Sequence, residues 1–352
     1  MDVELGLVGL PQSGKSSLLA LLCGGPPSGR VAVALVPDPR LDTLAAMLHP
    51  RKVTPAHLQL TELAGLVPGR LERGARNAFF EGVRRTDALL HVVRAFEDPA
   101  LPHPCGGVDP LRDARSMEEE LLLADLERVD AVAERLRKNR ARSREEELQL
   151  GVLDRCAQAL GDAIPVRRVG LNDDDLRLLT GFGLLTARSA LMALNVGEAE
   201  LRDATDRWPE LWAWASEAGM WVVPCSARVE AEIAGLDGED RAAFLASYGL
   251  RETGTDRLAR AAYAALGLIS FLTAGEDEVR AWPIAEGTSA RKAAGKIHSD
   301  IERGFIRAEV ASFADLEAVG TWKGLRDRGM LRLEGKDYTV RDGDVIEFRF
   351  HV

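Results

Sequence analysis

Residues 9–16, Gly-Leu-Pro-Gln-Ser-Gly-Lys-Ser, have the types and spacing of a phosphate-binding loop and match the pattern GxxxxGK(S/T) in full. Glycines in such a loop let backbone N–H groups converge on phosphate oxygens, and the next helix points its positive dipole end at them. The lysine would neutralise the β- and γ-phosphates during catalysis, and the serine hydroxyl would ligate Mg²⁺. We therefore predict a nucleotide site formed by Pro11, Gln12, Ser13, Gly14, Lys15, Ser16 and Ser17.

A second motif is expected downstream, where a strand ends in an Asp that holds magnesium through water. Residues 61–65, Thr-Glu-Leu-Ala-Gly, keep the spacing but carry Glu62 instead. The extra methylene is enough to disturb an octahedral shell with ligands at about 2.1 Å. We still predict Ser16 and Glu62 as metal ligands, and Gly65 as the catalytic glycine whose N–H meets the γ-phosphate. Leu66 stands where Ras-type GTPases place a water-orienting glutamine, so hydrolysis needs another group.

Base recognition is predicted at two later strand ends. Residues 195–198, Asn-Val-Gly-Glu, follow an apolar strand where guanine-specific proteins carry Asn-Lys-x-Asp. The longer acid no longer matches the paired guanine donors, so strict GTP specificity is not expected. Residues 224–227, Pro-Cys-Ser-Ala, fit the turn that backs the base. Although each motif is common by itself, together they give the predicted base-binding residues Asn195, Val196, Glu198, Ser226 and Ala227.

Short apolar strands must position these loops. Segments 3–10, 57–63, 88–93, 190–196 and 220–224 have this character, with helix-length segments between several of them. Such alternation predicts an α/β P-loop fold whose mostly parallel sheet is covered on both faces. The uncharged run 261–274 is too short for the roughly 20 residues that span a bilayer, and we interpret it as a buried helix.

The stretch 117–185 is instead rich in Leu, Glu and Arg at helical spacing. Apolar residues at 122, 126, 129, 133 and 136 fall on one face, and a second helix has Leu148, Val152, Cys156 and Leu160 at four-residue steps. We predict an inserted antiparallel helical hairpin of coiled-coil type with a basic tip. A solvated turn and a nucleic-acid contact are equally weighted interpretations of this tip. Its basic residues are Arg135, Arg137, Lys138, Arg140, Arg142 and Arg144.

From about residue 276 the pattern changes to short strands separated by glycines, which predicts a small α+β module. Ile346, Phe348 and Phe350 alternate with polar residues there, as in a half-buried strand. The predicted domains are therefore 1–116 and 186–275 for the P-loop domain, 117–185 for the insertion, and 276–352 for the C-terminal module.

Composition limits the function classes. The 352 residues carry a formal net charge of −10, which argues against a broadly basic nucleic-acid binder but permits one local basic patch. Four dispersed cysteines without a CxxC pair exclude a disulfide framework and indicate a reducing compartment. The acidic N-terminus lacks the features of a secretory signal. We expect a cytoplasmic protein, not bound to a membrane, that is a monomer.

The order of motifs, the insertion and the C-terminal module together resemble the Obg-like ATPase, or YchF, family over nearly the whole chain. The stretches that carry this resemblance are 36–42, 64–67, 91–98, 278–282, 294–298, 304–308, 334–338 and 342–345. The resemblance implies that the C-terminal module is a TGS domain and that ATP is accepted at least as well as GTP. It also implies ribosome association, through the basic tip and the TGS domain, and a catalytic role for His103 in the loop after the 88–93 strand.

Departures from the family pattern concern the nucleotide switch. The family carries a longer loop before residues 36–39, with a threonine that completes the magnesium shell, whereas only residues 23–30 fill this gap here. Residues 68–73, Pro-Gly-Arg-Leu-Glu-Arg, replace a flexible Gly-Ala-Ser segment. Two functions stay open: a slow Mg²⁺-dependent ATPase that regulates ribosome binding, and a divergent paralogue with impaired hydrolysis that acts as a ribosome, RNA or protein binding module.

Overall fold

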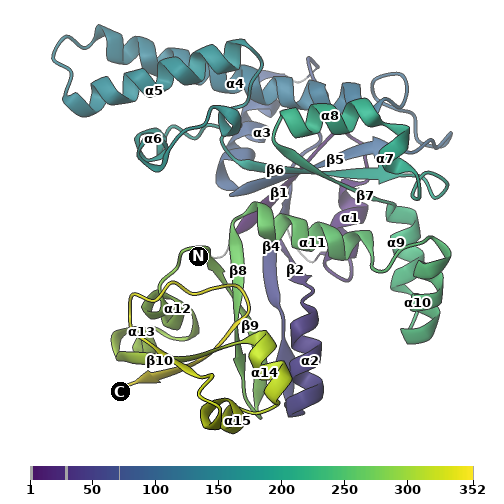
Figure 1. Cartoon of the computed structure of the whole chain (residues 1–352). Coiled ribbons are helices and arrows are strands. Elements are labelled where there is room, and N and C mark those ends of the chain that lie inside the picture. The colour runs from purple at the N-terminus through teal and green to yellow at the C-terminus, as the bar shows by residue number, and fades with distance from the viewer. Residues whose placement is uncertain (1–2, 28–30, 71, 352) are drawn as a thin grey trace. The chain divides into compact units, whose positions relative to one another are not determined.

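The computed structural model describes residues 3–27, 31–70 and 72–351 (Figure 1). The chain divides into two compact units, one of Met1–Val33 with Gln59–Ala262, and one of Ala34–Leu58 with Tyr263–Val352. Both units are therefore assembled from two separate chain segments. The predicted domain boundaries after residues 116, 185 and 275 stay a prediction beside this division.

The first unit contains the predicted α/β sheet, whose strand order is β2-β4-β1-β5-β6-β7. The strands in the order β4-β1-β5-β6-β7 are all parallel, and β1 lies between β4 and β5. The strands are β1 Glu4–Val8, β2 Val31–Val36, β4 Ala56–Glu62, β5 Ala88–Ala95, β6 Ser189–Val196 and β7 Met220–Cys225. Because parallel strands place their carboxyl ends at one edge, the loops after β1, β4, β5, β6 and β7 share that edge.

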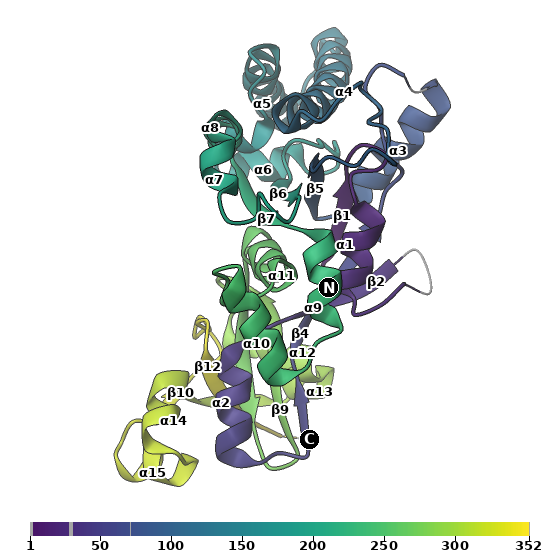
Figure 2. The same ribbon diagram turned by 90° about the vertical axis from the view of Figure 1, so that its right-hand side faces the viewer.

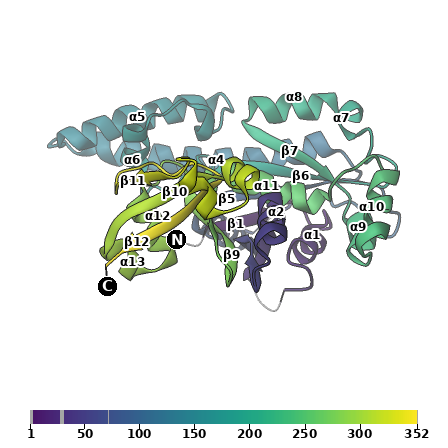
Figure 3. The same cartoon turned by 60° about the horizontal axis from the view of Figure 1, so that its bottom comes forward.

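The helices of this unit cover the sheet or form the inserted hairpin. They are α1 Lys15–Leu22, α3 Arg73–Arg85, α4 Pro110–Lys138, α5 Arg144–Gly161, α6 Asp173–Leu179, α7 Ala204–Arg207, α8 Pro209–Glu217, α9 Ala227–Ala234, α10 Gly238–Ser247 and α11 Gly254–Ala265. The core between sheet and helices includes Val93, Met192 and Leu194 from the strands and Phe79 and Met117 from α3 and α4. Figure 3 shows α8 running along β7.

The predicted helical hairpin is formed by α4 and α5, which lie side by side in Figures 1 and 2. Its own apolar core contains Leu122, Val129 and Ala133 from α4 and Cys156 from α5. The prediction that Leu148 belongs to the buried apolar face of α5 was wrong, because this side chain is 56% exposed. Four-residue steps advance about 40° beyond a full turn each, so a strict four-residue series leaves one face.

The second unit has a six-stranded sheet of order β11-β10-β12-β8-β9-β3. Its elements are α2 Pro39–Leu48, β3 Lys52–Thr54, β8 Leu268–Ala274, β9 Glu278–Ala285, α12 Ala290–Ile297, α13 Ser299–Arg303, β10 Phe305–Ser312, α14 Phe313–Val319, α15 Trp322–Asp327, β11 Arg332–Glu334 and β12 Asp344–Phe350. The interpretation of 261–274 as one helix was wrong. Gly267, with φ +63°, ends the helical stretch, and the β-branched and aromatic residues after it form β8.

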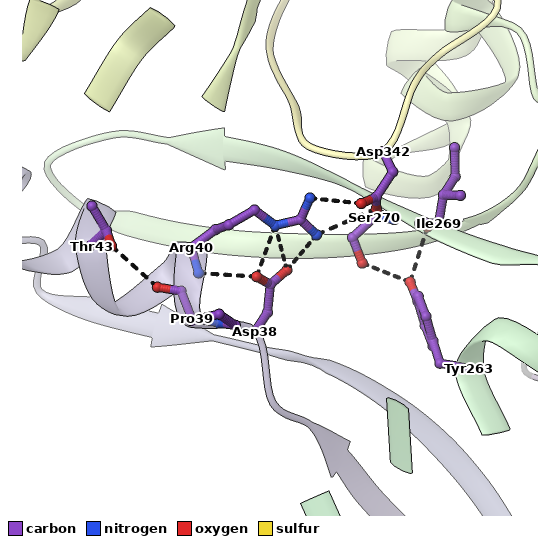
Figure 4. A network of polar contacts seen from close by, with 8 residues as sticks. All are labelled: Asp38, Pro39, Arg40, Thr43, Tyr263, Ile269, Ser270 and Asp342. Atoms are coloured by element: carbon purple, nitrogen blue, oxygen red, sulfur yellow. Dashed lines mark hydrogen bonds and ion pairs between the residues drawn. The ribbon is translucent and has the colours of Figure 1, made fainter. Parts of the chain in front are cut away.

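A polar network joins the two chain segments of this unit (Figure 4). Arg40, in the first turn of α2, hydrogen-bonds the Asp38 carboxylate at 2.7–3.1 Å and Oδ2 of Asp342 at 2.8 Å. Asp342 also accepts the backbone N–H of Ser270, whose hydroxyl shares a 2.7 Å hydrogen bond with Tyr263. Burial opposes the Arg40 charge, but the hydrogen bonds that Arg40 donates to both carboxylates raise the pKa of Arg40. The Arg40 guanidinium thus joins Asp38 to Asp342, which lies 302 positions after Arg40 in the sequence.

Candidate nucleotide-binding site

The loop between β1 and α1 has a backbone that requires glycine at two positions. Gly14 adopts φ +96° at the N-cap of α1, and a Cβ there would lie 2.3 Å from Nδ2 of Asn195. A Cβ on Gly9, at φ +147°, would lie 2.4 Å from the carbonyl oxygen of Val92. Gln12 is also in the left-handed region, at φ +63°. The loop is therefore tightly curled over the N-terminus of a helix, the geometry that presents N–H groups to an anion.

Lys15 lies folded over this loop and is 6% exposed. Its Nζ donates hydrogen bonds to the carbonyl oxygens of Gly9, at 3.1 Å, and Leu10, at 2.8 Å. Burial lowers the pKa of Lys15, and the negative charge of Glu62 acts in the opposite direction. A cation held in this way is already positioned and needs little reorganisation to meet a phosphate.

Ser16 and Glu62 meet directly. The Ser16 hydroxyl donates a 2.7 Å hydrogen bond to Oε1 of Glu62, across 46 residues of sequence. Hydroxyl and carboxylate oxygens are ligands that Mg²⁺ prefers, so this donor pair fits the metal that the motif implies. The longer acid therefore reaches the loop serine in this chain.

The second motif lines the same hollow as the loop. A hollow of about 530 Å³ has a wall that includes Pro11, Lys15, Ser16, Glu62 and Gly65. A Cβ on Gly65 would approach the backbone nitrogen of Pro11 to 3.0 Å, so the two backbones lie against each other. Leu66, in contrast, is 1% exposed and belongs to the apolar core.

Asn195 connects the loop to the predicted base-binding turn. Its Nδ2 donates to the carbonyl oxygen of Ser13 at 3.0 Å, and its Oδ1 accepts the backbone N–H of Ala227 at 3.0 Å. The structure thus brings the motifs after β1, β6 and β7 together. Val196 is buried, with its side chain in the sheet core.

A larger cleft of about 960 Å³ extends from this junction. Its wall includes Gln12, Gly14, Ser17, Asn195, Val196, Glu198, Ser226 and Ala227. The hydroxyl oxygens of Ser13 and Ser226 are buried and have no hydrogen-bond partner among the described residues. Such unpaired polar atoms are unusual in a folded core and favour a polar ligand at this junction.

Two aromatic residues of this region escaped the sequence prediction. Phe96, just after β5, lines the larger cleft, and Arg94 lies 4.6 Å from its ring centroid. Tyr248, at the end of α10, donates a 2.6 Å hydrogen bond to Oε1 of Glu198. An aromatic residue directly after an apolar strand could have signalled Phe96. No local pattern could have paired residues 50 positions apart.

His103 is not brought to the loop. Its Nε2 lies 2.9 Å from Oδ2 of Asp113, both side chains are almost fully buried, and the residue lines neither hollow described above. Its catalytic role stays a prediction. The side chains of His103, Cys105 and Asp113 offer ligand atoms within 4.8 Å of one another. Oδ1 of Asp113 pairs with Arg112, and Nδ1 of His103 accepts the Cys105 N–H, so two of the three groups are already engaged within the fold and a metal fits this group poorly.

The basic tip divides into two sets of side chains. Arg137 pairs with Asp154, and Lys138 pairs with Glu134. Arg142 donates to three carbonyl oxygens at the end of α4, those of Leu136, Arg137 and Asn139. Within the described part of the chain, no ion pair or side-chain hydrogen bond engages Arg135, Arg140 or Arg144.

The shortened segment before β2 is only partly visible, because residues 28–30 lie outside the described residues. Pro27 lines the hollow at Lys15. In the 68–73 segment, the backbone N–H of Gly69 donates to Glu120, which also pairs with Arg76. Leu71 lies outside the described residues.

Comparisons with known proteins give matches along the whole chain. A family model described as 50S ribosome-binding GTPase matches residues 4–139, and the YchF-GTPase C-terminal model, described as a protein of unknown function, matches residues 268–351. The Bacillus subtilis ribosome-binding ATPase YchF is 38% identical over 366 residues and covers 100% of both chains. The Caenorhabditis elegans Obg-like ATPase 1 is 35% identical, with 99% of this chain and 92% of that protein covered.

A solved structure is similar over the same length. The structure of the Schizosaccharomyces pombe YchF GTPase has a TM-score of 0.88 and 29% sequence identity, and the match covers 99% of this chain and 98% of that one. No helix in the described part of the chain is both long and apolar enough to cross a bilayer.

Proposed function

The chain belongs to the YchF family of Obg-like ATPases, and from that premise we propose that it binds ATP with Mg²⁺, hydrolyses it slowly and uses the nucleotide to control an association with ribosomes. The family resemblance seen in the sequence is confirmed by relatives that cover the chain from end to end. A ribosome partner and a cytoplasmic location agree with the similarity to the ribosome-binding ATPases of Bacillus subtilis and Haemophilus influenzae.

The observation that carries this proposal is the geometry of the Gly9–Ser16 loop. Lys15 is held by the loop carbonyls at the N-terminus of α1, where the helix dipole and the N–H groups favour phosphate oxygens. Ser16 and Glu62 would hold Mg²⁺, which supplies charge neutralisation at the β- and γ-phosphates. Phe96 and the Asn195–Ala227 junction would face the base end.

We expect slow hydrolysis because the residue after Gly65 is Leu66. Leu66 is buried in the core and has no polar atom, so it cannot orient an attacking water. Lys15 and the loop amides would stabilise the charge that develops on the γ-phosphate, but water orientation has to come from another group. A binding module without hydrolysis is the less favoured alternative, because every residue of the loop motif is present.

Calorimetric titration with ATP, GTP and ADP in the presence of Mg²⁺ tests this function, together with a phosphate-release assay. We expect saturable ATP binding, and Lys15→Ala should weaken it at least about tenfold and abolish turnover, because a preorganised charge contact to phosphate is lost. Lys323→Ala, on the exposed surface of the C-terminal unit, is the matched control and should behave as the parent protein.

Two results separate the alternatives. ATP binding that survives Lys15→Ala unchanged would refute the proposed site. Lys15-dependent binding without any phosphate release would instead favour the binding module.

A further inference from the structure

Tyr248 engages the acidic residue that stands where guanine-specific relatives of the fold carry their base-reading Asp. Its hydroxyl donates a 2.6 Å hydrogen bond to Oε1 of Glu198. The ring lies 5.2 Å, between centroids, from Phe244, and the guanidinium of Arg202 lies 5.9 Å from the ring centroid. Phe244 and Arg202 thus lie beside the ring whose hydroxyl donates to the carboxylate.

Tyr248 approaches Glu198 from outside the nucleotide cleft. Glu198 lines the cleft of about 960 Å³ that also contains Gly14 and Asn195. Tyr248 lines a separate hollow of about 470 Å³, together with Leu201, Arg202 and Ser247. The tyrosine does not line the cleft itself, so it is placed to act on a base there through the carboxylate.

The chemistry of the two purines makes this hydrogen bond relevant to base choice. Guanine presents two adjacent donors, N1–H and the 2-amino group, which a carboxylate recognises with both oxygens at once. Adenine presents one donor, the 6-amino group, beside the acceptor N1, which repels a second carboxylate oxygen. The Tyr248 hydrogen bond uses one acceptor position of Oε1 and draws charge from this oxygen. It therefore weakens the two-oxygen recognition of guanine more than a one-oxygen contact with adenine.

We propose that Tyr248 is a specificity-determining residue that engages one oxygen of Glu198, weakens its two-oxygen recognition of guanine and so favours adenine over guanine nucleotides. This inference rests on the proposed nucleotide function of the site. The hydrogen bond to Glu198 raises the pKa of Tyr248 above its ordinary value, so the hydroxyl remains a donor throughout the neutral range. Tyr248 is a positioning residue, because it acts through Glu198.

The test compares ATP and GTP dissociation constants of the full chain with Mg²⁺, for the parent protein and Tyr248→Phe. The ring and its packing are kept, so thermal stability should not change, while the ratio of the two constants should move toward GTP by about tenfold. Tyr338→Phe is the matched control, because it removes a similar 2.7 Å hydroxyl-to-carboxylate hydrogen bond, to Asp344, in the C-terminal unit. Its ATP:GTP ratio should stay that of the parent.

A double variant tests whether Tyr248 acts through Glu198. In Glu198→Gln the carboxylate is gone, so adding Tyr248→Phe should change the ATP:GTP ratio no further. A ratio unaffected by Tyr248→Phe in the parent background, or shifted equally in both backgrounds, would overturn the role of Tyr248 while leaving the nucleotide site intact. A parent protein that binds neither nucleotide would refute the proposed function itself, and with it the premise of this inference.

Discussion

At the residue scale, contacts between residues of different sequence motifs position the side chains of the site. Glu62 departs from the expected Asp, yet its carboxylate reaches the Ser16 hydroxyl at 2.7 Å. The Ser226 hydroxyl has no hydrogen-bond partner among the described residues, whereas both polar atoms of the Asn195 side chain are engaged in joining the loop to Ala227. The residue types were visible in the sequence, but whether each side chain is free for a ligand or engaged within the fold was not.

His91 illustrates how one buried residue beneath the loop makes stability depend on pH. It lies in the middle of β5, and burial, reinforced by the charge of Lys15, lowers the pKa of His91 to about 3. The unfolded chain therefore binds one more proton than the folded chain between pH 6.5 and about 3. The free energy of unfolding should be independent of this group above pH 6.5 and fall by up to about 1.4 kcal/mol per pH unit below it.

Urea denaturation of the parent and of His91→Leu at pH 7 and pH 5 measures this contribution. The parent should lose on the order of 2 kcal/mol more than the variant over this interval. The same substitution at the exposed His351 is the control, and its pH dependence should match the parent. An identical pH dependence in His91→Leu and the parent would show that the buried imidazole does not titrate as described.

At the element scale, the helical hairpin separates side chains that build the tip from side chains available to a partner. Arg142 closes the end of α4 through three carbonyl oxygens, whereas the Ser143 and Glu146 capping box starts α5. Arg142 therefore contributes to the turn in the way that a helix cap does. This division bears on the proposed ribosome contact, because only cations that face solvent can neutralise phosphates.

Co-sedimentation with ribosomes over a salt series distinguishes the two sets. Replacing Arg135, Arg140 and Arg144 together by Gln should weaken binding and lower the slope of log affinity against log salt by about 2, because three phosphate contacts are removed. Arg142→Gln should mainly lower the melting temperature. Replacing the exposed Arg73, Arg85 and Arg251 by Gln serves as the charge-matched control. Unchanged binding in the tip variant would mean that the tip is a solvated turn.

At the scale of the whole molecule, the chain segment between the two nucleotide motifs takes part in the C-terminal unit. Residues 34–58 supply α2 and β3, and β3 pairs in parallel with β9. Arg40 hydrogen-bonds Asp38 within this segment and Asp342 in the C-terminal part of the unit, and so connects the two. A C-terminal module defined only by sequence from residue 276 does not include these elements, so their contribution to its stability has to be tested in the full chain.

Arg40→Lys tests that contribution. A lysine ammonium cannot make paired hydrogen bonds to two carboxylates at once, so the variant should lose about 1–2 kcal/mol of unfolding free energy. Hydrogen exchange should increase first in residues 263–352. Arg51→Lys is the control, because its ion pair with Asp277 is exposed on both sides and should contribute little. Equal stability of the two variants would show that the Arg40 network is not structural.

The sequence by itself determined the loop, the fold class and the family, because each depends on contiguous residues or on regular spacing along the chain. The phosphate loop is eight consecutive residues, and the parallel sheet follows from alternating strands and helices. Only the tertiary structure decided which side chains meet. Ser16 donates a hydrogen bond to Glu62, His103 lies against Asp113 and away from the loop, and Tyr248 donates a hydrogen bond to Glu198. Side chains separated by up to 50 residues meet only when the chain has folded, so no local pattern encodes their contacts.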